Sequence, residues 1–222
     1  MLNRQRGVSL VELMIAMVLG LLVSAIVIGM FSSTVGSTRQ AITTIRLNQE
    51  LRTVMDLMVR DLRRSGFWNS GGAAASNPYA SITDAGAPVA VYAAAGAGNY
   101  LNSAVAGASG QCVILGYDSD SAGASVATRL IGYRLDTNDE AVEGLWTDTF
   151  VAPAHCNMGS WSNLTDEQTV RVTNLSFTPD PSPASFAVAT VRNLTITLEA
   201  ESRSDSRIKT RITDQVRVRN DL

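Results

Sequence analysis

The chain opens with one long apolar run. It extends from Val8 to Phe31, and Glu12 is the only charged residue within it. A helix of this length rises about 36 Å, which is enough to cross the hydrocarbon core of a bilayer, about 30 Å thick. Arg4 and Arg6 precede the run, and positive charges beside a membrane span are retained in the cytoplasm. The pattern predicts a single-pass membrane protein whose N-terminus is cytoplasmic and whose remainder is exported.

Helical spacing continues beyond the apolar run. Between Ser37 and Arg64 there is neither proline nor glycine, and apolar residues recur every three or four positions: Leu47, Leu51, Val54, Met55, Met58 and Leu62. Charged residues, Asp61 among them, flank this stripe, as on a helix that lies against a sheet. Gly66 follows, and glycine commonly closes a helix in the left-handed conformation. We therefore expect one helix from residue 8 to about residue 64.

A different pattern occupies the second half of the chain. Residues 67–111 are rich in Ala, Gly, Ser and Asn, which predicts a long irregular connection with one short strand near Pro88–Tyr92. Beyond Cys112 the period changes to two, and strands are expected at 113–115, 128–135, 169–177, 186–198 and 207–219. In the last of these, apolar and basic residues alternate, although Asp214 falls on the apolar side.

These elements together predict an α+β fold. A long N-terminal helix, with a transmembrane half and an amphipathic half, packs on an antiparallel β-sheet head. Alternation of this kind is typical of an antiparallel sheet with one face on the core and the other in water. We read the basic side of 207–219 as such a solvated face, with a subunit interface or a DNA contact as the alternatives.

Charge and cysteine content bound the function of the exported part. Residues 1–64 carry eight Arg and four acidic residues, whereas the rest carries ten basic and sixteen acidic ones, giving +4 and −6. An acidic exported part argues against nucleic-acid binding through a basic patch. The two cysteines, Cys112 and Cys156, both fall outside the membrane. In an oxidising compartment they are expected to form one disulfide, and the alternative is a pair of buried thiols.

Glu12 does not fit a simple membrane anchor. A carboxylate inside a spanning helix costs about 2.5–3.5 kcal/mol unless it is paired, so Glu12 is a candidate functional residue. One interpretation places Glu12 shallow enough to reach the headgroups, where it also favours the positive end of the helix dipole. The other requires a cation at the same depth. Cleavage after Gly7 would create one, because the new α-amino group of Val8 would lie about one helical turn from Glu12.

The residues around this position resemble a known signal. Gly7, then Val8-Ser-Leu-Val-Glu12-Leu-Met-Ile and the apolar run, is similar to the class III signal of type IV prepilins and type II secretion pseudopilins. The resemblance implies that prepilin peptidase cuts between Gly7 and Val8 and methylates Val8, and that Glu12 meets the N-terminal amine of a neighbouring subunit. Val8 replaces the usual Phe, and Ser9 the common Thr. A secretory signal peptide cut near residues 32–36 is the alternative.

A second resemblance lies at the end of the long helix. The segment Asp61-Leu-Arg-Arg-Ser-Gly-Phe-Trp68 is similar to the corresponding segment of PilW-type minor pilins. The two resemblances imply a leader at 1–7, a transmembrane and filament-core helix at 8–31, an amphipathic helix at 32–66, a connecting loop at 67–111 and a β head at 112–222.

The expected function follows from these resemblances. The chain would be a minor subunit of a type IV pilus that primes assembly near the filament tip. Its expected partners are prepilin peptidase, the major and other minor pilins, the inner-membrane assembly platform and the membrane itself. It would sit in the inner membrane with its head in the periplasm, and then in the pilus at the cell surface. A minor pseudopilin of type II secretion and a membrane-anchored binding module are the alternatives.

Little in the sequence points to chemistry. The single histidine, His155, adjoins Cys156, and one His with one Cys is too few ligands for a structural zinc site. The acidic clusters at Asp118–Asp120 and at 136–140 do not complete a calcium-binding loop. No phosphate-binding glycine loop or serine-centred triad occurs. We expect no enzymatic activity, no cofactor and no bound metal.

Overall fold

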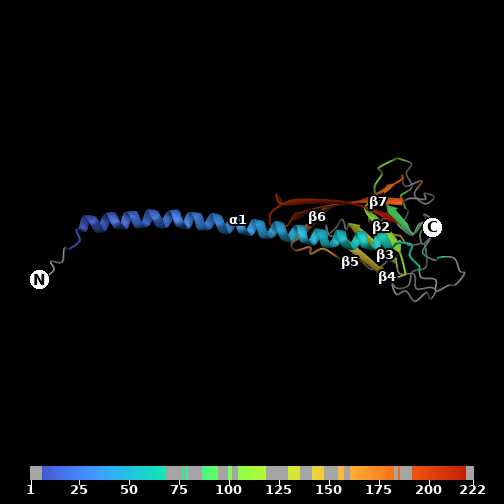
Figure 1. Ribbon diagram of the computed structural model, residues 1–222, viewed down its shortest axis with the longest axis horizontal. Coiled ribbons are helices and arrows are strands. Elements are labelled where there is room, and N and C mark those ends of the chain that lie inside the picture. Colours follow the sequence, from blue (N-terminus) through green and yellow to red (C-terminus); the bar gives the residue numbers. More distant parts are fainter. Residues whose placement is uncertain are drawn as a thin grey trace. The chain divides into compact units, whose positions relative to one another are not determined.

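The computed structural model describes residues 7–68, 77, 79, 87–94, 100–101, 105–118, 130–135, 142–147, 155–157, 161–182, 185 and 192–218. The chain divides into two compact units, Met1–Ile45 and Arg46–Leu222. One helix, α1 (Leu10–Arg64), contributes its first part to the first unit and its last part to the second (Figure 1). By length and composition, α1 is the one helix among the described residues that could span a membrane.

The end of α1 is fixed to the strands beside it. Gly66 has a φ of 77°, the left-handed conformation expected for the residue that closes the helix. Its N–H donates a hydrogen bond of 2.8 Å to the carbonyl of Gly116. The buried Ser65 hydroxyl donates one of 2.8 Å to the carbonyl of Pro88. The predicted helix end is therefore confirmed, and it coincides with a junction between the helix and two strands.

Two antiparallel sheets form the second unit. The first follows the chain order β1 (Val89–Tyr92), β2 (Cys112–Gly116), β3 (Leu130–Leu135), β4 (Val142–Thr147) and β5 (Trp161–Asn163). The second consists of β6 (Val170–Asp180), β7 (Arg192–Ser202) and β8 (Lys209–Val218). A backbone bridge joins them, because Gly110 and Phe177 exchange hydrogen bonds of 3.0 and 2.8 Å. The predicted α+β architecture, a long helix packed on antiparallel sheets, is confirmed.

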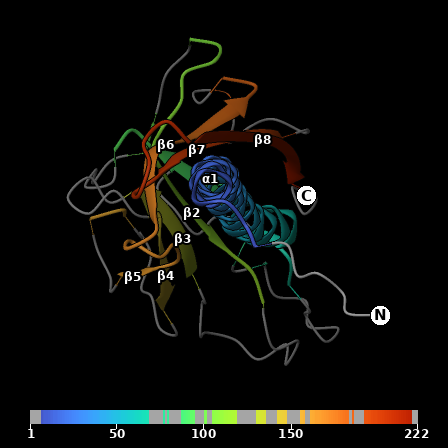
Figure 2. The ribbon, with the colours of Figure 1, turned by 90° about the vertical axis from the view of Figure 1, so that its left-hand side faces the viewer.

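The main core lies where α1 meets both sheets (Figure 2). All six apolar helix residues named from the sequence are buried there. They pack against alternate residues of β1–β3, such as Val91, Val113 and Ile131, and against the inner face of the second sheet. The helical spacing of the sequence therefore correctly identified the packed side of α1.

The first sheet departs from the expected alternation. The side chains of β1 and β2 are buried on both faces of the sheet. The face opposite α1 carries a second apolar cluster that includes Tyr79, Tyr92, Cys112, Ile114 and Cys156. The water-facing side inferred from the alternation of residues 207–219 does not extend to these strands, because a disulfide-linked segment and several aromatic side chains cover their second face. In β8 the predicted alternation is present, with Val216 and Val218 buried and Arg217 exposed between them.

Two strands were not predicted. The β4 strand contains Gly144 and lacks a clear alternation, and β5 is only three residues long. Conversely, β7 continues to Ser202, four residues beyond the expected end at residue 198. Residues 128–129, 186–191 and 219 of the expected strands lie outside the described residues.

Candidate processing and assembly site

The candidate cleavage site precedes the first helical turn. Gly7, Val8 and Ser9 are exposed and not helical, and the Val8 side chain is 72% accessible. Helical hydrogen bonding begins at the carbonyl of Ser9, which accepts a bond of 3.1 Å from the N–H of Leu13. The Gly7–Val8 peptide bond therefore lies in accessible, non-helical backbone, the kind of segment that proteases cut. Arg4 and Arg6 lie outside the described residues.

Glu12 occupies the first turn of α1. Ser9 stands three positions before it, at the start of helical hydrogen bonding, which is the Ser-x-x-Glu pattern of a helix capping box. A negative charge here also favours the positive end of the helix dipole. The uncut chain thus offers Glu12 a local role at the helix start. The dipole effect was expected from the sequence, whereas the Ser-x-x-Glu spacing, equally visible there, was overlooked.

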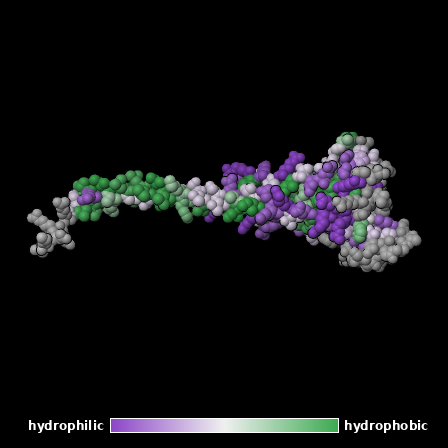
Figure 3. All heavy atoms as spheres, viewed as in Figure 1, coloured by the Kyte–Doolittle hydropathy of each residue, from purple (hydrophilic) through white to green (hydrophobic). Residues whose placement is uncertain are grey.

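The first unit presents apolar side chains around this carboxylate. All large hydrophobic residues from Val8 to Phe31 are exposed, and Figure 3 shows hydrophobic surface along this part of α1. The Ser24 and Thr34 hydroxyls donate hydrogen bonds of 2.8 and 2.9 Å to the carbonyls of Gly20 and Met30. These hydroxyls therefore have partners inside the helix, which suits a segment surrounded by lipid or by other helices.

In the second unit, Asp61 is buried rather than exposed on a helix flank. It is 2% accessible, and the hydroxyls of Tyr117 and Tyr133 both donate hydrogen bonds to its carboxylate, the first of 3.0 Å. The sequence placed Asp61 among the charged flanks of the helix. It is buried instead because two tyrosines, one directly after β2 and one in β3, supply the donors that a buried carboxylate needs. Burial, followed by the charge of Asp61, raises the pKa of Tyr117 to about 12. The same causes raise the pKa of Tyr133 further.

A second carboxylate of α1 holds a loop. Glu50 accepts a hydrogen bond of 2.6 Å from the backbone N–H of Asp166. Asp166 in turn accepts hydrogen bonds from the N–H of Gln168 and the hydroxyl of Thr169, so it closes the turn before β6. Partial burial raises the pKa of Glu50 above its ordinary value. Glu50 is therefore already engaged by its own chain.

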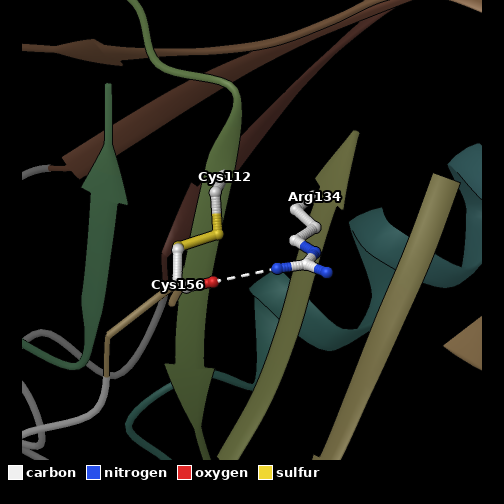
Figure 4. The surroundings of a disulfide bond; sticks show 3 residues. All are labelled: Cys112, Arg134 and Cys156. Atoms are coloured by element: carbon white, nitrogen blue, oxygen red, sulfur yellow. Dashed lines mark hydrogen bonds between the residues drawn. A yellow bond between two sulfur atoms is a disulfide. The ribbon is translucent and has the colours of Figure 1, made fainter. Parts of the chain in front are cut away.

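Cys112 and Cys156 form the disulfide that the export topology predicts. Their Cα atoms are 6.4 Å apart, within the usual range. Arg134 extends beside the bridge and donates a hydrogen bond of 3.2 Å to the carbonyl of Cys156 (Figure 4). Its guanidinium also lies 4.2 Å from the ring centroid of Trp161. The disulfide and Arg134 thus hold the segment around Cys156 over the second face of the first sheet.

The basic side of β8 is paired with acidic residues of β7. Glu201 forms ion pairs with Arg171 at 3.3 Å and with Lys209 at 3.2 Å. Glu199 pairs with Arg211 at 3.4 Å. In the turn before β8, Asp205 pairs with Arg207 at 3.0 Å. The Lys209 and Arg211 side chains are 69% and 67% accessible. This side of the sheet is therefore exposed and largely charge-compensated.

Across the described part of the chain, no group of three or more His, Cys, Asp or Glu residues gathers that could hold a metal ion. His155 packs with the edge of the Tyr92 ring, their centroids 6.1 Å apart. Asp118 is buried beside the helix end, where its N–H donates to the carbonyl of Phe67. Asp120 and residues 136–140 lie outside the described residues.

Comparisons with known proteins agree with this arrangement. Residues 2–28, which include Gly7, Val8 and Glu12, match the prokaryotic N-terminal methylation motif. Residues 40–218 match the family described as prepilin peptidase-dependent protein B, which covers most of the chain. Searches of curated proteins and of solved structures found no match. The chain is a prepilin-like protein of the type IV pilin class, and it belongs to the family of prepilin peptidase-dependent protein B.

Proposed function

We propose that this protein is a minor subunit of a type IV pilus that primes filament assembly near the tip. The observation that carries the proposal is the position of Glu12. It is the only charged residue between Val8 and Phe31, and it lies in the first turn of an exposed apolar helix, four positions after the Val8 of the accessible Gly7–Val8 bond.

The proposed mechanism joins processing to assembly. Prepilin peptidase cuts at Gly7–Val8 and methylates the new amine of Val8. The mature chain stays in the inner membrane as a single span, with its head in the periplasm. A carboxylate in an apolar environment is costly unless it is paired. Glu12 therefore draws the chain toward the N-terminal amine of another subunit, while the apolar surface of residues 8–31 packs against neighbouring helices.

The proposed partners follow from this mechanism. They are prepilin peptidase, the major pilin, other minor pilins and the inner-membrane assembly platform. Because Glu12 needs an amine from a neighbouring chain, another subunit lies ahead of this one, and the protein is not the topmost subunit. The head takes no catalytic role and needs no cofactor. From the inner membrane the protein passes into the pilus at the cell surface.

The test compares two isosteric changes in the same helix. Glu12→Gln removes the charge near the N-terminus, whereas Glu50→Gln makes the same change in the head and keeps an oxygen that can accept the Asp166 N–H. We expect both variants to be processed, but only Glu50→Gln to enter the sheared fibre fraction normally. Normal incorporation of Glu12→Gln would contradict the mechanism.

A deletion strain separates the proposed function from its nearest alternative. The match to the methylation motif and the match to the family are both compatible with a pilus subunit and with a pseudopilin of type II secretion. Loss of surface pili and twitching motility, with normal release of exoproteins, is the expected result. Loss of exoprotein release with normal piliation would assign the chain to secretion instead.

A further inference from the structure

We propose that an arginine ridge on α1 docks against an acidic surface of an adjacent pilin-type subunit. The ridge consists of Arg46, Arg52, Arg60 and Arg63, all exposed and all within the second unit. This inference rests on the proposed function, because it assumes that such subunits stand side by side in one fibre.

The four arginines share one side of the helix. At 3.6 residues per turn they fall within about 120° of arc. The opposite side carries the buried stripe from Leu47 to Leu62 that packs on the sheets. Asp56 lies within the same arc and is the one exposed acidic residue of the helix in this stretch, since Glu50 is half-buried against the loop at Asp166 and Asp61 is buried. This side of the helix therefore carries four positive charges against one negative charge.

The ridge arginines differ from the basic residues of the second sheet in their ion pairing. Arg171, Lys209 and Arg211 form ion pairs with Glu199 or Glu201. Among the described residues, by contrast, none of the four ridge arginines forms an ion pair. The chain thus pairs Lys209 and Arg211 of its exposed basic strand with its own acidic residues, whereas Asp56 is the only exposed acidic residue of the helix beside the ridge.

Charge complementarity favours a protein partner of the same class. Outside the helix, residues 65–222 carry ten basic and sixteen acidic residues, a net charge of −6. A subunit built on the same plan would therefore present an acidic head to the basic ridge of its neighbour. Complementary potentials of this kind set register and suppress wrong partners more than they add affinity. The ridge would then fix how neighbouring heads stand relative to one another.

The test places a photo-crosslinking amino acid at Gln49, an exposed position between the ridge arginines. The full-length protein is produced in its own cells and irradiated, and the adducts are identified by mass spectrometry. We expect adducts with a protein that carries the N-terminal methylation motif. Adducts with phospholipid, with DNA or only with proteins that lack the motif would overturn the proposal.

Charge reversal supplies the second measurement. In the Arg52→Glu/Arg63→Glu variant the adduct and the amount in the fibre fraction should fall about tenfold, because like charges then face each other. Arg217→Glu, an exposed arginine of β8, is the matched control and should leave both unchanged. Formation of the Cys112–Cys156 disulfide on a non-reducing gel shows that each variant has folded.

The outcomes separate this inference from the function beneath it. If the unaltered protein enters fibres and the reversed variant enters equally well, the ridge has no docking role and the proposal fails alone. If the unaltered protein never enters fibres, the proposed function fails and the ridge proposal fails with it.

Discussion

The Tyr133 hydroxyl of β3 donates a hydrogen bond to the Asp61 carboxylate of α1, across 72 positions of sequence. Tyr117, which follows β2, donates a second bond of 3.0 Å to the same carboxylate. A helix that packs only through an apolar stripe can rotate or slide by small amounts at little cost. A buried carboxylate with two fixed donors removes that freedom, because any shift leaves polar atoms unpaired.

Tyr133→Phe should therefore destabilise the head. Removing a hydrogen bond to a charged group costs about 1.5–3 kcal/mol. We expect a loss of that size in the free energy of unfolding of the detergent-solubilised full chain, followed by chemical denaturation. Tyr100→Phe is the control, since Tyr100 is half-buried in the other cluster and should change stability by much less. Equal losses in both variants would remove any special role for the contact with Asp61.

The same contact predicts a loss of stability in alkali. The pKa of Tyr117 is raised from 10.0 to about 12 in the folded state, so between these values the unfolded chain has released a proton that the folded chain still holds. The stability that this pKa shift contributes is then fully present below pH 10 and is lost as the pH rises toward 12. The midpoint temperature of unfolding, measured over this range, should fall less in Tyr117→Phe than in the unaltered protein. An identical pH dependence in both would contradict the assignment.

Reduction of the disulfide should lower the stability of the head and expose the second apolar cluster. Cys112 and Cys156 are 44 positions apart, and closing a loop of that length contributes about 4 kcal/mol in the chain-entropy model. We expect Cys112→Ser/Cys156→Ser to lose a comparable free energy of unfolding and to show a changed tryptophan emission, because Trp161 packs beside the bridge. Adding reductant should lower the stability of the unaltered protein but not that of the double variant.

Gly110→Ala should disturb the junction between the two sheets. A Cβ atom at this position would lie 2.1 Å from the carbonyl oxygen of Tyr92, which is backbone and cannot rotate away. Forced overpacking of this kind costs about 1–3 kcal/mol. Gly36→Ala is the matched control, because a Cβ there would meet nothing within 4 Å and the helix should tolerate or gain from it. A Gly110→Ala protein as stable as the control would show that the sheets adjust freely.

Much of the fold could be predicted because its patterns are local. Helical spacing identified the buried side of α1, Gly66 marked its end, and the alternation in residues 207–219 identified the two sides of β8. The N-terminal motif was equally readable, since Gly7, Val8 and Glu12 lie within six consecutive positions.

The errors arose where distant residues decide the environment. Asp61 is of a residue type usually found on the surface, and only the hydroxyls of Tyr117 and Tyr133, far along the chain, make its burial possible. The second face of the first sheet is buried because the disulfide holds the segment around Cys156 against it. The sequence pattern of β1 and β2 gives no indication of this covering segment. Arg134 was overlooked for the same reason, since its partners Cys156 and Trp161 lie more than twenty positions away.

The decisive measurement for processing and assembly at Gly7–Val8 is mass spectrometry of the mature protein recovered from sheared fibres. We expect a chain that begins with N-methylated Val8, carries the Cys112–Cys156 disulfide and is present in the fibre fraction. A protein that still begins with its leader, or that never appears in that fraction, would rule out cleavage-dependent assembly through Glu12.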